Sequence, residues 1–140
     1  MPLRDPIDVS SWRSELLQAL ERSFVPLSHA IVFGSVAGGT ANPASDIDVA
    51  VAVPDRPLSS EEKLDLIERL AEATGRPVDL VDLRTVGEPL LGEILRNGVR
   101  LIGSDEVHTA LLLRHLYDEA DFSPLQRRIL TERRQAWIGA

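Results

Sequence analysis

The sequence predicts a single-domain α/β fold in which helices pack against a β-sheet. Segments of helical periodicity alternate with short β-branched or alternating runs, Gly and Pro mark the boundaries between them, and no internal repeat is present. The length of 140 residues suits one domain, because a single hydrophobic core typically serves roughly 100–200 residues. We therefore expect residues 1–140 to form one domain with one functional site.

The first part of the chain predicts a helix and two strands. Residues 11–24 carry apolar side chains at helical spacing, including Phe24, and Pro26 ends the helix. The run 30–33 is β-branched and aromatic, which indicates a buried strand, and a turn-rich stretch then extends to Ser45. The run 47–53 alternates as a second strand, and one of its faces carries Asp46, Asp48, Ala50 and Ala52.

The remaining elements continue this alternation. A capping-box pattern at Ser59 and Glu62 opens a helix that Gly75 ends. We expect its apolar face to consist of Leu64, Ile67, Leu70 and Ala71. The later predicted elements are a strand at 78–83, a helix at 90–97, a strand at 99–102, a helix that opens at 104–106, and a basic C-terminal helix that starts at Ser123.

Composition argues against several classes of protein. The net charge of -7 disfavours direct nucleic-acid binding, which draws its affinity from Lys and Arg. The absence of cysteine removes thiolate metal sites and cysteine nucleophiles. No apolar run approaches the roughly 20 residues of a membrane helix, and the N-terminus lacks the pattern of a secretory signal. We therefore expect a cytoplasmic protein without a membrane partner.

Scattered features outside these patterns have ordinary structural interpretations. The three histidines, His29, His108 and His115, lack the spacing of a zinc site and are expected to be structural or surface residues. The Leu-rich run 111–113 is expected to pack in the core. None of these residues indicates a second site.

Gly34 and Ser35 directly follow the first predicted strand. Glycine lets a backbone approach a ligand closely, and the N–H groups and hydroxyl that follow can hold phosphate oxygens. A Gly-Ser pair by itself is usually only a turn. The pair therefore indicates a phosphate-binding site only if a second motif accompanies it.

Asp46 and Asp48 supply the second motif. Two residues apart on a strand, their carboxylates project from one face and repel each other unless a cation lies between them. Mg²⁺ takes carboxylate and phosphate oxygens, and two such ions roughly 3.5–4 Å apart suit phosphoryl or nucleotidyl transfer. An isolated Asp-x-Asp is more often an incidental surface pair.

The strand at 78–83 offers a third carboxylate, from either Asp79 or Asp82. The two aspartates have opposite parity along the strand, so only one of them can face the site. We favour Asp79, because it lies near the start of the strand, and place Asp82 on the opposite face, where Arg84 could pair with it.

These residues resemble the signature of the DNA-polymerase-β-like minimal nucleotidyltransferases. The pattern Gly-Ser-x10-Asp-x-Asp is matched by Gly34, Ser35, Asp46 and Asp48, and the resemblance spans roughly residues 30–83. Chain length and the context of the motifs narrow it to the MntA-like antitoxins, which are paired with HEPN-domain HepT toxins.

The resemblance implies a single-domain nucleotidyltransferase fold with a mixed β-sheet, ATP as cosubstrate, and Mg²⁺ as the metal, with two ions. Gly34 and Ser35 would bind the nucleotide. The metal ligands and catalytic residues would be Asp46, Asp48 and Asp79, with Asp79 as a possible general base. The enzyme would be an antitoxin that transfers AMP from ATP to a tyrosine of a HEPN-domain toxin, releases pyrophosphate and neutralises the toxin's ribonuclease within a hetero-oligomer.

One departure from the family and two alternatives stay open. Relatives carry Arg shortly after the Gly-Ser pair, whereas this chain has Val-Ala-Gly-Gly at 36–39, where Gly38 and Gly39 either donate N–H groups to phosphate or form an ordinary loop. The protein could instead be a non-catalytic antitoxin that acts by binding, or a nucleotidyltransferase for a small hydroxylated molecule. The base preference, the number of AMP units and the stoichiometry of the complex do not follow from the sequence.

Overall fold

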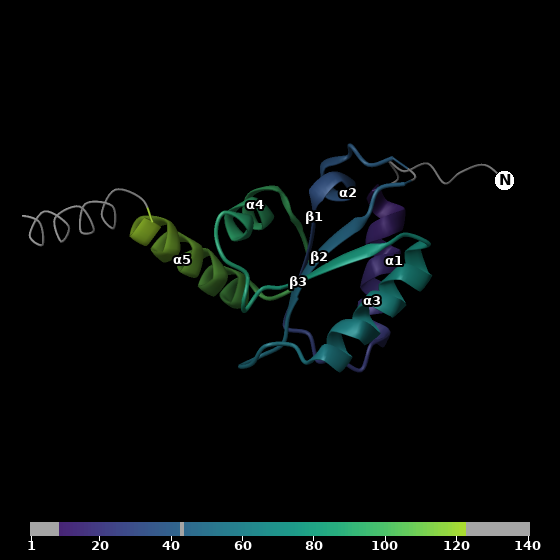
Figure 1. Cartoon of the computed structure of the whole chain (residues 1–140), viewed down its shortest axis with the longest axis horizontal. Coiled ribbons are helices and arrows are strands. Elements are labelled where there is room, and N and C mark those ends of the chain that lie inside the picture. Colours follow the sequence, from purple (N-terminus) through teal and green to yellow (C-terminus); the bar gives the residue numbers. More distant parts are fainter. Residues whose placement is uncertain (1–8, 43, 123–140) are drawn as a thin grey trace, which may run out of the picture.

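The computed structural model of the protein describes residues 9–42 and 44–122 (Figure 1). In chain order its elements are α1 (Val9–Arg22), β1 (His29–Phe33), α2 (Gly34–Gly38), β2 (Ile47–Ala52), α3 (Ser60–Thr74), β3 (Val78–Asp82), α4 (Leu90–Asn97), β4 (Val99–Ile102) and α5 (Asp105–Phe122). The four predicted strands are all present. The predicted basic helix from Ser123 lies outside the described residues.

The strands form a mixed four-stranded sheet in the order β3-β2-β1-β4. Strand β1 is antiparallel to both β2 and β4, whereas β2 and β3 are parallel. The parallel pair is possible because α3 crosses over the sheet between its two strands. The predicted α/β class with a mixed sheet is therefore confirmed.

Helices cover both faces of the sheet (Figure 1). Helices α1 and α3 pack on one face, where strand alternation places Val32, Val49 and Val51 at 0% exposure. Helix α4 and one residue of α5, Leu111, cover the opposite face over Ala50. Each large side chain buried in this way contributes roughly 1.5–3 kcal/mol, so these two cores hold the sheet between its helices.

Helices α1 and α3 depart from the expectations in which side chains they bury. Helix α1 ends at Arg22, so Phe24 lies beyond it and is 65% exposed. In α3 the inward stripe runs through Leu66 and Leu70, and Leu64 is 58% exposed, so the expected apolar face was wrong at that residue. Positions four apart share a helix face, whereas positions two apart lie about 200° apart around the axis.

Helix α2 was not expected, since its glycines are poor helix formers. It forms because the chain must turn sharply after β1, and the turn buries Val36 in the core below α1. The capping box of α3 is confirmed: Ser59 Oγ accepts from the N–H of Glu62, and Glu62 accepts from the N–H of Ser59.

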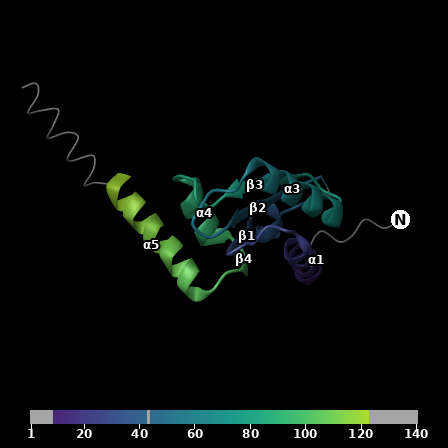
Figure 2. The ribbon, with the colours of Figure 1, turned by 90° about the horizontal axis from the view of Figure 1, so that it is seen from below.

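Helix α5 leaves the body of the molecule and is attached mainly by polar contacts at one side (Figure 2). The Arg114 guanidinium donates to the carbonyls of Leu83, at 2.5 Å, and Val86, and His115 Nδ1 lies 2.5 Å from Glu88. Of the Leu-rich run only Leu111 is buried, so the expectation of core packing was wrong for the other two leucines. Leu112 and Leu113 lie about 100° and 200° around the helix axis from Leu111, and both are exposed.

The base of α5 is fixed by a histidine pair. His29 Nε2 lies 3.1 Å from His108 Nδ1, and His29 is 2% exposed. Burial, followed by the charges of His108 and Arg100, lowers the pKa of His29 to about 4. Both histidines are thus structural, as expected. Within the described residues, no helix is both long enough and apolar enough to cross a membrane.

Candidate active site

Three aspartates lie near one another at the end of the sheet where β2 and β3 begin. The register of the parallel pair sets Asp48 on β2 beside Asp79 on β3, and Asp46 lies two residues before Asp48 on the same side. This side is the one covered by α4. The structure therefore places the three predicted carboxylates near one another, from two neighbouring strands that α3 separates in the sequence.

Gly34 forms the wall behind Asp48. It follows Phe33, the register partner of Asp48 on β1, and has a φ of +73°, a conformation that side chains other than glycine rarely adopt. A Cβ atom at this position would lie 2.2 Å from Asp48 Oδ2, well inside van der Waals contact. The predicted Gly-Ser and Asp-x-Asp motifs are therefore in direct contact, and only glycine fits at their junction.

The electrostatics of the site centre on Asp48. Burial, followed by repulsion from Asp79, Asp46 and Glu93, raises the pKa of the Asp48 carboxyl. Glu93, in the first turn of α4, thus adds a fourth carboxylate that the sequence motifs did not reveal. A site with this much negative charge favours a cation in place of protons.

The carboxylates nevertheless do not form a ready-made cage. Over the ranges 9–42 and 44–122, no three His, Asp or Glu side chains are gathered closely enough to hold a metal ion. Mg²⁺ does not need such a cage, because it commonly binds through one or two carboxylates together with waters and substrate phosphates. The oxygen donors at this edge of the sheet fit that mode of binding.

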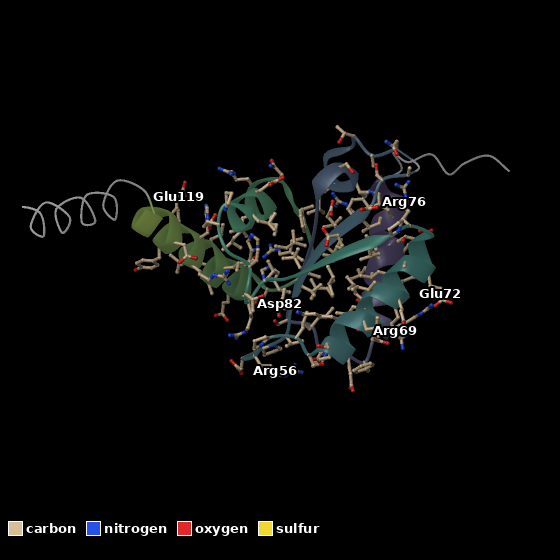
Figure 3. All side chains as sticks on the ribbon, in the orientation of Figure 1. Arg56, Arg69, Glu72, Arg76, Asp82 and Glu119 are labelled. Carbon is tan, nitrogen blue, oxygen red and sulfur yellow. The ribbon has the colours of Figure 1, made fainter. Side chains whose placement is uncertain are left out.

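Asp82 is occupied elsewhere. It is 6% exposed, and its two carboxylate oxygens accept from the backbone N–H groups of Leu58 and Arg84, both at 2.8 Å (Figure 3). The Arg84 guanidinium lies 3.8 Å from Asp55, so the expected side-chain pair with Asp82 was wrong. Asp82 holds the segment before α3 against the end of β3 and faces away from Asp48.

Ser35 and the glycine pair belong to α2. Ser35 is its second residue, and Ser35 O accepts from the N–H of Thr40 at 3.0 Å. Gly39 ends the helix with a φ of 74°, and its N–H is directed at Val36 O at 3.4 Å. The glycine pair therefore ends a helix, which favours the structural alternative for Gly38 and Gly39.

The loop before Asp46 is closed by its own hydrogen bonds and by an arginine. Ser45 Oγ accepts from the N–H of Asn42 at 2.9 Å, and Asn42 Oδ1 accepts from the N–H of Ala44 at 2.8 Å. Arg76, between α3 and β3, donates to the carbonyl oxygens of Asn42 and Ser45 at 2.8 and 3.3 Å. No sequence motif identified this arginine, because its partners are backbone atoms distant in the chain.

Comparisons with known proteins agree with this geometry. Residues 15–107 match the family described as Polymerase beta, Nucleotidyltransferase. The chain is 31% identical over 112 residues to the protein adenylyltransferase MntA of Shewanella oneidensis, which covers 76% of this chain and 80% of that protein. It is also similar to a toxin–antitoxin crystal structure with AMP-PNP, with a TM-score of 0.68 and 28% identity over 91% of this chain and 95% of that chain.

A crystal structure of the MntA–HepT toxin–antitoxin pair is a further structural neighbour. It aligns with a TM-score of 0.63 and 25% identity over 93% of this chain and 96% of that chain. The mixed sheet packed by helices is the architecture that the sequence predicted. The chain therefore belongs to the polymerase β nucleotidyltransferase family.

Proposed function

We propose that this protein is the antitoxin of a toxin–antitoxin pair, and that it transfers AMP from ATP to a tyrosine of a HEPN-domain, HepT-like toxin. The observation that carries the proposal is the contact of Gly34 with Asp48, with Asp79 in register beside it, in a chain 31% identical to a protein adenylyltransferase. The modification neutralises the toxin's ribonuclease, and the two proteins form a hetero-oligomer in the cytoplasm. Residues 1–140 act as one catalytic domain.

The geometry supports an assignment of the nucleotide and metal sites. Ser35, with the backbone at Gly34, contacts the triphosphate where α2 begins. Asp46, Asp48 and Asp79 would hold two Mg²⁺ ions through their carboxylate oxygens. When bound, Mg²⁺ supplies positive charge to the phosphates and to the departing pyrophosphate. The raised pKa of Asp48, which comes from burial and then from repulsion by neighbouring carboxylates, supports this assignment, because a bound cation would stabilise the charged carboxylate.

The residues of the chain then position the acceptor and move one proton. The tyrosine oxygen forms a bond to the α-phosphorus in line with the bond that breaks, between that phosphorus and the oxygen bridging to the β-phosphate. Pyrophosphate leaves with the bonding electrons. Asp79, exposed at the edge of the site, takes the phenolic proton as general base. The product is an AMP–tyrosine phosphodiester, and no covalent enzyme intermediate is needed.

Intact-mass measurement tests the proposal. The protein is incubated with ATP, Mg²⁺ and the HEPN protein encoded beside it, and the masses of both proteins are recorded. We expect the toxin to gain one or more AMP units, Asp48→Asn to abolish the gain, and Asp65→Asn to leave it unchanged, since Asp65 pairs with Arg69 on α3. Neutralisation of the toxin without a mass gain would instead support binding alone, and consumption of ATP only with a small hydroxylated molecule would support a different acceptor.

A further inference from the structure

We infer that Arg76 is a positioning residue for the metal site, because its guanidinium ties the loop that leads into Asp46 to the start of the strand that carries Asp79. The inference rests on the proposed function for what the site binds. Its structural basis is independent of the acceptor and consists of two hydrogen bonds from Arg76 Nη1, at 2.8 Å to Asn42 O and 3.3 Å to Ser45 O.

The hydrogen bond to Ser45 O bears directly on Asp46. A peptide unit is planar, so the carbonyl of Ser45 and the N–H of Asp46 turn together. Asp46 itself lies outside β2 and is exposed, so the strand ladder does not hold it. An acceptor bond on the preceding carbonyl therefore limits the orientation of the Asp46 backbone, and with it the direction of the carboxylate.

The second hydrogen bond fixes the rest of the loop. Asn42 O accepts both from Arg76 and from the N–H of Ser45, the latter at 3.0 Å. The N–H of Asn42 in turn donates to Ser45 Oγ. The turn from Asn42 to Ser45 is thus internally closed, and Arg76 is its connection to the neighbouring strand.

The other end of Arg76 is anchored where β3 begins (Figure 3). Its backbone N–H is directed at Thr74 Oγ1 at 3.3 Å, and it precedes Pro77, which restricts it to extended backbone. Pro77 O accepts from the N–H of Ile47 at 2.9 Å, and two residues further on Asp79 stands beside Asp48. Arg76 therefore connects the approach to Asp46 with the approach to Asp79.

An arginine suits this role better than a lysine. The planar guanidinium offers five N–H donors in a fixed arrangement, whereas a lysine ammonium is a mobile point charge on a flexible stem. A misplacement of about 1 Å in a catalytic group can cost on the order of 10²-fold in rate. Loss of Arg76 is expected to act through the placement of Asp46, so magnesium binding should weaken while docking of the toxin is preserved.

The test compares Arg76→Gln and Arg76→Lys with a matched control, Arg69→Gln, which removes an exposed arginine of α3 that pairs with Asp65. Magnesium affinity is measured by calorimetry with α,β-methylene-ATP, which cannot be transferred, in the absence of toxin. The dependence of AMP transfer on Mg²⁺ and on toxin concentration is measured separately. Amide hydrogen exchange at Ala44, Ser45 and Asp46 reports on the loop itself.

We expect Arg76→Gln to weaken magnesium binding tenfold or more, to leave the KM for the toxin unchanged, and to speed amide exchange in the loop, with Arg76→Lys intermediate and Arg69→Gln like wild type. Wild-type magnesium affinity in a folded Arg76→Gln protein would overturn the inference. If Arg76→Gln does not fold, Arg76→Lys decides by the same criterion. If wild-type protein binds the nucleotide with Mg²⁺ but modifies no toxin, the proposed function fails while the affinity comparison still tests Arg76.

Discussion

Replacing Gly34 with alanine should separate catalysis from folding. The new Cβ would lie 2.2 Å from Asp48 Oδ2, while real Cβ contacts essentially never fall below 3.0 Å, so the carboxylate must move by about 1 Å. A displacement of that size in a proposed metal ligand is expected to lower kcat/KM for AMP transfer on the order of 10²-fold. The positive φ of +73° adds a stability cost of roughly 1–2 kcal/mol.

Gly75→Ala is the matched control for this prediction. Gly75 has a φ of +67° at the end of α3, and a Cβ there would meet nothing within 4 Å. It should therefore show a similar loss of stability, seen as a fall of several degrees in Tm, with wild-type activity. Activity of Gly34→Ala within about threefold of wild type, or equal inactivity of both variants, would refute the steric reasoning.

Three further predictions concern charges. Asp82→Asn should lower the free energy of unfolding by about 1–3 kcal/mol in urea denaturation and keep AMP transfer, because Asp82 accepts two backbone N–H groups. Asp79→Asn should abolish AMP transfer and keep the stability of the wild type, and inactivity of a folded Asp82→Asn would count against this assignment. Mg²⁺ should raise the Tm of the wild type but hardly that of Asp48→Asn, and equal Tm shifts of the two proteins in calorimetry would disprove this. Without metal, Asp48→Asn should be slightly more stable than the wild type, because the raised pKa of Asp48 shows that its negative charge is unfavourable in the folded protein. Because the pKa of His29 is lowered to about 4, the unfolded chain binds a proton at a higher pH than the folded protein does. The free energy of unfolding should therefore fall as the pH falls from about 6.5 towards 4, by about 2 kcal/mol between pH 8 and pH 5. His29→Gln should flatten this pH dependence in urea titrations.

The core of the site could be predicted from the sequence because strand geometry is regular. Alternation alone places Asp46 and Asp48 on one face, and opposite parity separates Asp79 from Asp82, as the structure shows. The contact of Gly34 with Asp48 does not follow from strand alternation. It depends on the antiparallel register of β1 with β2, which local sequence patterns do not predict.

Contacts between residues that are distant in the chain could not be predicted from the sequence. Glu93 faces Asp48 only because α4 packs over that end of the sheet, and Arg76 reaches carbonyl groups more than thirty residues earlier in the chain. The burial of leucines in α3 and α5 also depended on which side of each helix meets the sheet. Periodicity finds a helix reliably, but a helix with apolar residues on two sides, such as α3, leaves its inward face undetermined.

The parallel pairing of β2 with β3 has a consequence for biosynthesis. The first two strands, with Gly34 and Asp48, form a hairpin-like antiparallel pair from nearby parts of the chain, but Asp79 joins them only after α3 has crossed the sheet. Such long-range pairing forms late, because chain entropy must be spent before the contact is made. A nascent chain on the ribosome therefore brings Asp46, Asp48 and Asp79 together only after β3 has emerged. Any substitution that loosens α3 should lower the fraction of active molecules, although it changes none of these three aspartates.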